Sequence, residues 1–214
     1  MSPAFKKLDN GEIGTIGYQR VNFHIIFDVK MKDFRRKDRL VAGGHVTEPP
    51  ATITYESIVL RETVRIALTL AALNDLPVKV ADIQNAYINA PITEKIWTVL
   101  CQEFGEYDER KAIVVRALYG LKIAGADFRN HFSYCMHHLG FFPCPAKLDL
   151  WMKPMVRPKD GFDYYAYVLI YVDYVMVIHH DAESVLRRIY NYFKLKPSSI
   201  GDPDIYLGSK LKKM

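Results

Sequence analysis

Apolar and polar residues follow one another along this chain in short runs, and these runs predict a mixture of strands and helices. Residues 23–29 (FHIIFDV) are rich in strand-forming residues, and a charged stretch separates them from Leu40–Ala42. This pattern predicts two antiparallel strands joined by a basic turn. Shorter apolar runs at 78–81, 96–100 and 112–115 predict further strands.

Three longer segments predict helices. The first, residues 57–74, carries a stripe at steps of four and three that predicts a buried face, made of Val59, Thr63, Ile66, Leu70 and Leu73. The second covers residues 124–139 and is closed by Gly140. The third runs from Asp181, a residue that can cap a helix, to Lys194.

Residues 164–178 contain two apolar runs that are separated by Asp173 and Tyr174. Such a pattern predicts a hairpin that presents an acidic group at its turn. Residues 205–211 predict a last short strand. The order of these elements favours an α+β fold over a doubly wound parallel sheet.

The composition is that of a globular protein and excludes a disordered tail or a fibre. The chain has 214 residues, of which 50% are hydrophobic, and 29 Lys and Arg against 24 Asp and Glu give a net charge of +5. This modest surplus allows a polyanionic partner. The most apolar run, residues 166–178, is interrupted by Asp173 and is shorter than the roughly 20 residues of a membrane-spanning helix.

The cysteines and the N-terminus predict an intracellular protein, cytoplasmic or nuclear. Three cysteines, an odd number without a CxxC pair, are typical of reduced thiols. The first residues lack the apolar core of a signal peptide, so we expect no export.

Two carboxylates follow apolar strand residues. Asp82 ends the run VKVAD, and Asp173 lies inside YVLIYVDYVMVI. A charge at such a place is costly unless it is paired, solvated at a turn or bound to a cation. Each acid alone is more often a strand-end group that faces water. Together, at two strand tips, they suggest a shared Mg²⁺ site.

Several ordered motifs resemble the reverse transcriptase of copia-like retrotransposons. They are ADIQNAY, RALYGLKIAGADF and YVDYVMVI, with KDRLVAGGH and ITYESIVLRETVRIALTLAAL upstream and DIYLGSKL downstream. The resemblance covers roughly residues 18–211. It implies an RNA-directed DNA polymerase that joins a primer 3′-hydroxyl to the α-phosphate of a dNTP with the help of two metal ions.

The resemblance also implies an α+β fold with a palm, whose antiparallel sheet packs on helices, and with fingers. It predicts that the thumb and RNase H regions are absent from this chain and are supplied elsewhere or lost. The implied division is a loose lead-in at 1–17 and a reverse-transcriptase-like domain at 18–214, with fingers at about 18–78 and 90–116 and palm at about 79–89 and 117–214.

The motif positions imply roles for individual residues. Asp82 and Asp173 match the catalytic carboxylates. Together with the backbone carbonyl of Ile83, they match the ligands of Mg²⁺, and Mn²⁺ suits the same oxygen donors.

Other positions match the family's dNTP site, namely Lys37, Arg39, Tyr87 and Ile123. A ring at Tyr87 would lie beneath the sugar and favour deoxynucleotides, although an ordinary core tyrosine is the alternative. Lys37 and Arg39 would hold the triphosphate, whereas alone they would be a solvated basic turn. Arg116 and Lys122 would face the template or the nucleotide.

This chain departs from the family's pattern at several of these positions. Tyr174 replaces the second Asp of the hairpin motif, and Ile123 stands where relatives carry Gln or Ser. Asp127 and Phe128 stand where Arg and Trp are common. Each 1.36 kcal/mol of lost transition-state stabilisation slows a reaction about tenfold. We therefore expect a severe defect from Tyr174.

Three hypotheses for the function stay open. The first is a polymerase domain, impaired in this copy, that acts on an RNA template, a DNA primer and dNTP. The second is an inactive remnant of a retrotransposon. The third is a non-catalytic module that binds RNA or an RNA–DNA duplex through phosphate contacts that weaken with salt.

Overall fold

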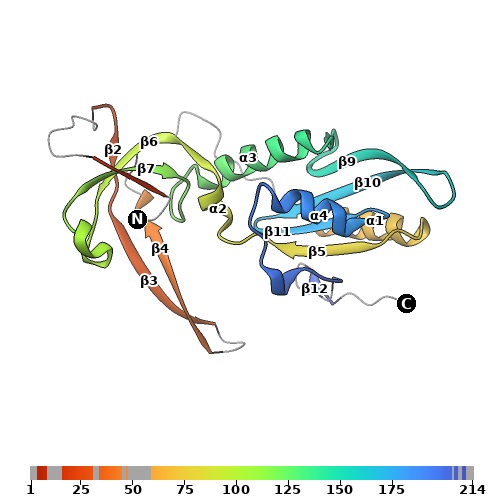
Figure 1. Ribbon diagram of the computed structural model, residues 1–214, viewed down its shortest axis with the longest axis horizontal. Helices are drawn as coiled ribbons and strands as arrows, with labels where there is room; N and C mark the ends of the chain where they lie inside the picture. The colour runs from red at the N-terminus through yellow and green to blue at the C-terminus, as the bar shows by residue number, and fades with distance from the viewer. Residues whose placement is uncertain are drawn as a thin grey trace. The chain divides into compact units, whose positions relative to one another are not determined.

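The computed structural model describes residues 4–8, 16–30, 34–44, 47, 59–203, 205–206 and 209–210 (Figure 1). The chain divides into two compact units. The first unit comprises residues 1–56 and 87–131, and the second comprises residues 57–86 and 132–214. Both sheets and helices occur, so the fold is of the mixed kind that the pattern predicts.

A four-stranded sheet forms the centre of the first unit, in the order β1-β7-β6-β2. Its strands are β1 (Phe5–Lys7), β2 (Gln19–Arg20), β6 (Pro91–Val99) and β7 (Lys111–Arg116). Strands β6 and β7 pair antiparallel, which confirms the predicted strands at 96–100 and 112–115. Strand β2 pairs parallel with β6. A short 3-10 segment (η2, Gln102–Tyr107) lies between β6 and β7.

The basic strand pair is a two-stranded ribbon of its own, conspicuous in Figure 1. Strand β3 (Phe23–Lys30) pairs antiparallel with β4 (Arg35–Ala42) along its whole length. This confirms the two predicted antiparallel strands. The prediction of a basic turn over the charged stretch is wrong for residues 35–39, which belong to β4. Phe27 is 76% exposed on this ribbon.

The end of β4 lies against the turn of the RALYGLK motif. The Ala42 N–H donates to the Tyr119 carbonyl at 2.7 Å. Gly120 has a φ of +90°, and a Cβ there would lie 2.1 Å from the Ala42 oxygen. A Cβ on Gly44 would lie 2.2 Å from the Gly120 oxygen. Both positions therefore require glycine, and two of the motifs that carry the resemblance pack together.

The second unit is built on a five-stranded sheet whose neighbouring strands all pair antiparallel. Its order is β5 (Val78–Asp82), β11 (Tyr174–Ile178), β10 (Phe162–Tyr171), β9 (Lys147–Arg157) and β8 (Phe142–Cys144). The predicted β10–β11 hairpin is confirmed. Strands β8 and β9 were not predicted. Instead of one strand over 205–211, two short strands pair antiparallel, β12 (Ile205–Tyr206) and β13 (Ser209–Lys210).

Helices α3 (Ala124–His138) and α4 (Ala182–Tyr190) confirm two of the predicted helices. Helix α4 contacts strands β5 and β11 (Figure 1). Asp181 caps it by accepting the Ser184 N–H, as predicted, although the helix ends at Tyr190 rather than at 194. Two shorter elements are α2 (Ala86–Asn89) and η3 (Pro197–Ser199).

The remaining predicted helix, α1 (Arg61–Leu73), is present. Its predicted buried face is confirmed at Val59 and Thr63 but is wrong at Ile66 and Leu73. The buried residues are Thr63, Val64, Ala67 and Ala71, whereas Ile66 is 62% exposed and Leu73 is 77% exposed. Three of the buried side chains are small, which allows a close approach of the helix to its neighbours. The sequence pattern had favoured the larger apolar residues instead.

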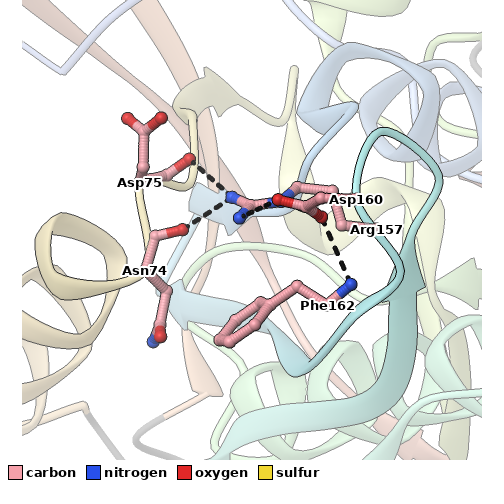
Figure 2. A network of polar contacts seen from close by, with 5 residues as sticks. All are labelled: Asn74, Asp75, Arg157, Asp160 and Phe162. Atoms are coloured by element: carbon pink, nitrogen blue, oxygen red, sulfur yellow. Dashed lines mark hydrogen bonds and ion pairs between the residues drawn. The ribbon is translucent and has the colours of Figure 1, made fainter.

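Arg157, the last residue of β9, ties the β9–β10 hairpin to the end of α1 (Figure 2). Its Nη1 donates to the Asn74 carbonyl at 2.8 Å, where α1 ends, and a cation is favourable at the C-terminus of a helix. Its Nε and Nη2 donate to the Asp160 carboxylate, and the Phe162 N–H donates to the same carboxylate at 3.2 Å. One arginine thereby fixes both the hairpin turn and the helix end.

Within the described part of the chain, no helix combines the length and the apolar character that crossing a membrane requires.

Candidate active site

The two predicted catalytic acids lie at adjacent strand ends in the second unit. Asp82 is the last residue of β5 and stands opposite Tyr174, the first residue of β11. Asp173 lies in the turn between β10 and β11, because Tyr171 and Tyr174 form the last pair of that hairpin. The Ile83 N–H donates to the Asp173 carbonyl at 2.7 Å. The backbones of both acids therefore meet at one end of the sheet.

The core of the sheet explains why these acids stand at its end. Val80 and Ala81 in β5 and Val175 and Met176 in β11 are almost fully buried. A carboxylate inside that core would lose its hydration without compensation. Asp82 instead keeps 31% of its side chain exposed.

The turn that presents Asp173 is strained. Val172 has a φ of +55°, a region that is sparsely populated for residues other than glycine and is an outlier for a β-branched residue. Strain of this kind persists where the surrounding structure imposes it. Here the antiparallel pairing of β10 with β11 on either side of the turn imposes it.

A second chain segment encloses Asp82, and the sequence pattern did not reveal it. The Lys196 N–H donates to the Asp82 carbonyl at 2.9 Å, and the Asp82 N–H donates to Ser199 Oγ at 2.7 Å. The Ser199 hydroxyl donates in turn to the Lys196 carbonyl at 2.7 Å. The Lys196 ammonium lies 3.3 Å from Asp82 Oδ2. In the sequence this segment is only the run KPSS (residues 196–199) after a predicted helix, and such a run is typical of an ordinary solvated turn.

The residues at this sheet end include oxygen donors of the kind that a divalent cation binds. The carboxylates of Asp82 and Asp173 and the backbone carbonyl of Ile83 could serve as ligands, and Mg²⁺ is commonly bound through one or two carboxylates. Among the described residues, no group of three or more His, Cys, Asp or Glu side chains gathers as a metal site. The position opposite Asp82 is Tyr174, which carries a phenol and not a carboxylate.

A group of rings and one cation gathers in the first unit. The Tyr87 ring lies 4.6 Å from the Tyr119 ring and 6.1 Å from the Phe128 ring, measured between centroids. The Arg39 guanidinium lies 6.0 Å from the centre of the Tyr119 ring. Two of the predicted nucleotide-site residues, Arg39 and Tyr87, thus contact the same ring. The sequence pattern did not single out Tyr119.

The other predicted nucleotide-site residues are also in the first unit. Lys37 is exposed on β4 and pairs in register with Asp28. Ile123 is 1% exposed, just before α3 begins, and its side chain lies in the core.

The two cations that flank the ALYGL motif bind backbone within the first unit. Arg116 Nη1 donates to the Asn89 carbonyl at 3.2 Å. Lys122 Nζ donates to the Thr47 carbonyl at 2.6 Å. Both side chains therefore have structural partners, and their predicted contacts with template or nucleotide stay predictions.

Asp127, which stands where the resemblance expects an Arg, is buried and hydrogen-bonded within the first unit. Asp127 is 3% exposed on α3 and accepts the Thr93 N–H at 3.1 Å and the Thr93 hydroxyl at 2.8 Å. Burial raises the pKa of Asp127, and the bonds from Thr93 oppose that rise. Burial, helped by the charge of Asp127, also raises the pKa of Glu94.

Comparison with known proteins shows the class to which the chain belongs. Residues 12–214 match the family described as reverse transcriptase (RNA-dependent DNA polymerase), and the chain belongs to this family. It is similar to retrovirus-related Pol polyproteins from two Arabidopsis thaliana transposons, which supports a reverse transcriptase domain of the copia-like kind.

The similarity to these two polyproteins is confined to a small part of each. Identity to the polyprotein from transposon RE1 is 26% over 153 residues, which is 69% of this chain and 10% of that protein. Identity to the polyprotein from transposon RE2 is 24% over 189 residues, which is 84% of this chain and 12% of that protein. The chain thus spans about a tenth of the length of the curated relatives it matches.

Proposed function

We propose that this chain is an RNA-directed DNA polymerase domain of a copia-like retrotransposon, impaired in its catalytic step. Family membership supports the class of reaction. The observation that carries the proposal is the meeting of Asp82 and Asp173 at the ends of β5 and of the β10–β11 hairpin. In this proposal the second unit contains the palm, and the β3–β4 ribbon belongs to the fingers.

The proposed roles follow the chemistry of each side chain. The carboxylates of Asp82 and Asp173 and the carbonyl of Ile83 would hold divalent cations, Mg²⁺ or Mn²⁺. Such cations, when bound, stabilise the attacking 3′-oxygen of the primer and the leaving pyrophosphate oxygen. The protein's own task would be to hold the carboxylate and carbonyl ligands in place, and the pairing of the strand ends supports this role.

The residues of the first unit would bind the nucleotide. Lys37 and Arg39 carry positive charges suited to a triphosphate. Tyr87, held against Tyr119, would exclude a 2′-hydroxyl and so favour dNTP over rNTP. Ile123, whose side chain lies in the core, would support this region from within and offers no hydrogen-bonding group to the nucleotide. The RNA template and the DNA primer would be held mainly through their phosphates.

Tyr174 is the reason to expect impairment. A neutral phenol supplies neither the negative charge nor the hard anionic oxygen that a carboxylate gives to Mg²⁺. Tyr174 lies directly opposite Asp82. The negative charge that an Asp would bring is therefore absent next to a proposed cation ligand. We expect the unmodified chain to extend primers at least about a hundredfold more slowly than the Tyr174→Asp variant, which corresponds to about 2.7 kcal/mol.

Primer extension on an RNA template tests the proposal, with Mg²⁺ and with Mn²⁺ in separate reactions. The unmodified chain runs beside Tyr174→Asp, Asp82→Asn and Asp108→Asn, the last being an exposed acid far along the chain from either motif. The proposal predicts a signal from Tyr174→Asp that is lost when Asp82→Asn is added, and no effect of Asp108→Asn. Extension by Tyr174→Asp that survives Asp82→Asn would refute the assignment of Asp82.

A second candidate function is binding of RNA or an RNA–DNA duplex without synthesis. Tyr174 and the net charge of +5 favour it, because phosphate contacts do not need a metal site. This function predicts an affinity for primer–template that falls steeply as the salt concentration rises. It also predicts that neither the unmodified chain nor the Tyr174→Asp variant extends a primer. If neither synthesis nor salt-sensitive binding is observed, the chain is an inactive remnant.

A further inference from the structure

A turn of the second unit forms a closed ring of bonds around Asp82. Lys196 and Ser199, at the two ends of the η3 turn, bond to the Asp82 carbonyl and the Asp82 N–H, and to each other. Gly201 continues the contact by exchanging backbone bonds with Val80. The backbone of Asp82 is therefore fixed on the side away from β11, independently of any ligand.

The side chain of Lys196 adds a charge to this ring. Its ammonium lies 3.3 Å from Asp82 Oδ2, and the side chains of Lys196 and Asp82 are 42% and 31% exposed. A partly exposed ion pair of this kind is weak and is exchanged readily for another partner. The Lys196 ammonium thus forms a weak ion pair with the carboxylate that a divalent cation would use, and this pair can break when another partner binds.

This ion pair has a consequence for cation binding. The positive charge of Lys196 lies 3.3 Å from Oδ2 of Asp82, an oxygen that a divalent cation would approach in the proposed site. A like charge at that distance opposes the arrival of the cation.

We propose that Lys196 is a positioning residue that holds the Asp82 carboxylate in the metal-free protein and competes with divalent cations for it. The inference rests on the proposed function of Asp82 as a cation ligand and adds a regulator to it. A cation binds when the ammonium swings away into solvent, which its exposure permits. Lys196 therefore weakens cation binding at this sheet end.

Binding of Mn²⁺ alone, without nucleotide or nucleic acid, tests this inference. Free Mn²⁺ is measured by electron paramagnetic resonance during titration of the full chain and of its variants. Lys196→Gln removes the charge and Lys196→Arg keeps it. Lys194→Gln is the matched control, since Lys194 is an exposed lysine two residues away in the same segment. Asp82→Asn removes the shared carboxylate, and circular dichroism checks that each variant folds.

We expect Lys196→Gln to tighten the Kd for Mn²⁺ by about three- to tenfold. The Kd of Lys196→Arg should stay close to that of the unmodified chain. Lys194→Gln should change the Kd less than about twofold, because solvent screens the charge of Lys194. Asp82→Asn should abolish the gain in affinity that Lys196→Gln gives. A purely structural role of Lys196 would not separate the Gln variant from the Arg variant in this way.

Two outcomes would overturn the inference and are distinct from each other. Equal Mn²⁺ affinity in the unmodified chain and in Lys196→Gln, with loss in Asp82→Asn, would refute competition by Lys196 and leave the proposed metal site intact. Binding that does not depend on Asp82, or no binding by any variant, would refute the proposed metal site itself and the inference with it.

Discussion

Tyr174 stands directly opposite Asp82 in the antiparallel pairing of β11 with β5. Residues that face each other in this way project to the same side of the sheet with their Cβ atoms about 4.5–5.5 Å apart. The side chain of Tyr174 therefore starts beside that of Asp82, at the position where the resemblance expects a second acid. The substitution alters the immediate neighbour of Asp82 rather than a distant support.

This relationship predicts opposite effects of Tyr174→Asp in the absence and presence of metal. Without metal, two carboxylates directly opposite each other repel, and we expect the variant to lose about 0.5–1 kcal/mol of unfolding free energy beyond the loss from the smaller side chain. Added Mn²⁺ should stabilise the variant more than the unmodified chain, because binding to the folded state raises its stability. Thermal unfolding with and without Mn²⁺ measures both effects.

Tyr174→Asn is the matched control for this prediction. It has nearly the same size as the Asp variant but carries no charge, so it isolates the electrostatic part of the change. A Mn²⁺-dependent rise in melting temperature that is equal for the Asn and Asp variants would contradict the role assigned to the added carboxylate.

The buried side chain of His179 leads us to expect a lower free energy of unfolding at acidic pH. Its side chain is buried, and its Nδ1 accepts the Asp181 N–H at 2.8 Å at the start of α4. Burial, with the charge of His180 as a second cause, lowers the pKa of His179 to about 4. Its ordinary value is 6.5, so the unfolded chain binds this proton more readily than the folded one. The resulting stability is present above about pH 6.5 and is lost as the pH falls toward 4, by at most about 3 kcal/mol.

Unfolding by urea at a series of pH values checks this prediction. In His179→Asn the side-chain oxygen can still accept from Asp181, but the group no longer titrates, so the fall of stability in this window should become shallower. His24→Asn, at an exposed histidine of β3, is the control and should keep the full slope. An unchanged slope in His179→Asn would show that another group drives acid unfolding.

The bond between Thr93 and Asp127 predicts a second effect on stability. Thr93→Val keeps the shape of the side chain and removes the hydroxyl that donates to the buried carboxylate at 2.8 Å. Hydrogen bonds to charged groups contribute about 1.5–3 kcal/mol, and we expect a loss at the lower end of that range. Because burial raises the pKa of Asp127, the loss should grow as the pH rises above that pKa and the carboxylate ionises.

The test compares Thr93→Val with Thr69→Val, which removes an exposed hydroxyl on α1 that bonds only within its own helix turn. We expect the unfolding free energy to fall clearly in the first variant and little in the second. A double-mutant cycle with Asp127→Asn should show that the two changes are not additive. Additivity would mean that the hydroxyl and the carboxylate act separately.

Local patterns were sufficient to predict much of this fold. The β3–β4 and β10–β11 hairpins and helix α3 follow from runs and periodicities that a few neighbouring residues determine. The two acids, Asp82 and Asp173, were found because a charge at the end of an apolar strand is conspicuous. These features need no knowledge of which segments pair over long distances.

Other features depend on distant partners and were missed. Strand β9 (Lys147–Arg157) contains charged residues and a proline, and its register is set by β10 and β8 on either side. Ile66 and Leu73 are exposed because smaller residues of α1 face the core. Lys196 matters through its contact with Asp82, 3.3 Å away in space and far away in the chain. A single sequence contains no local signal for that contact.

The strained turn before Asp173 gives the last prediction. Val172 has a φ of +55°, and a β-branched residue in that region costs about 1–3 kcal/mol. Asn tolerates positive φ much better than Val and does not add the chain entropy of Gly to the unfolded state. We therefore expect Val172→Asn to raise the unfolding free energy by about 1 kcal/mol. Val156→Asn is a matched control, since Val156 is an exposed valine of β9 without positive φ, and there Asn should give no gain. Chemical denaturation of both variants measures the difference. An equal effect at both positions would mean that the turn before Asp173 stores no strain.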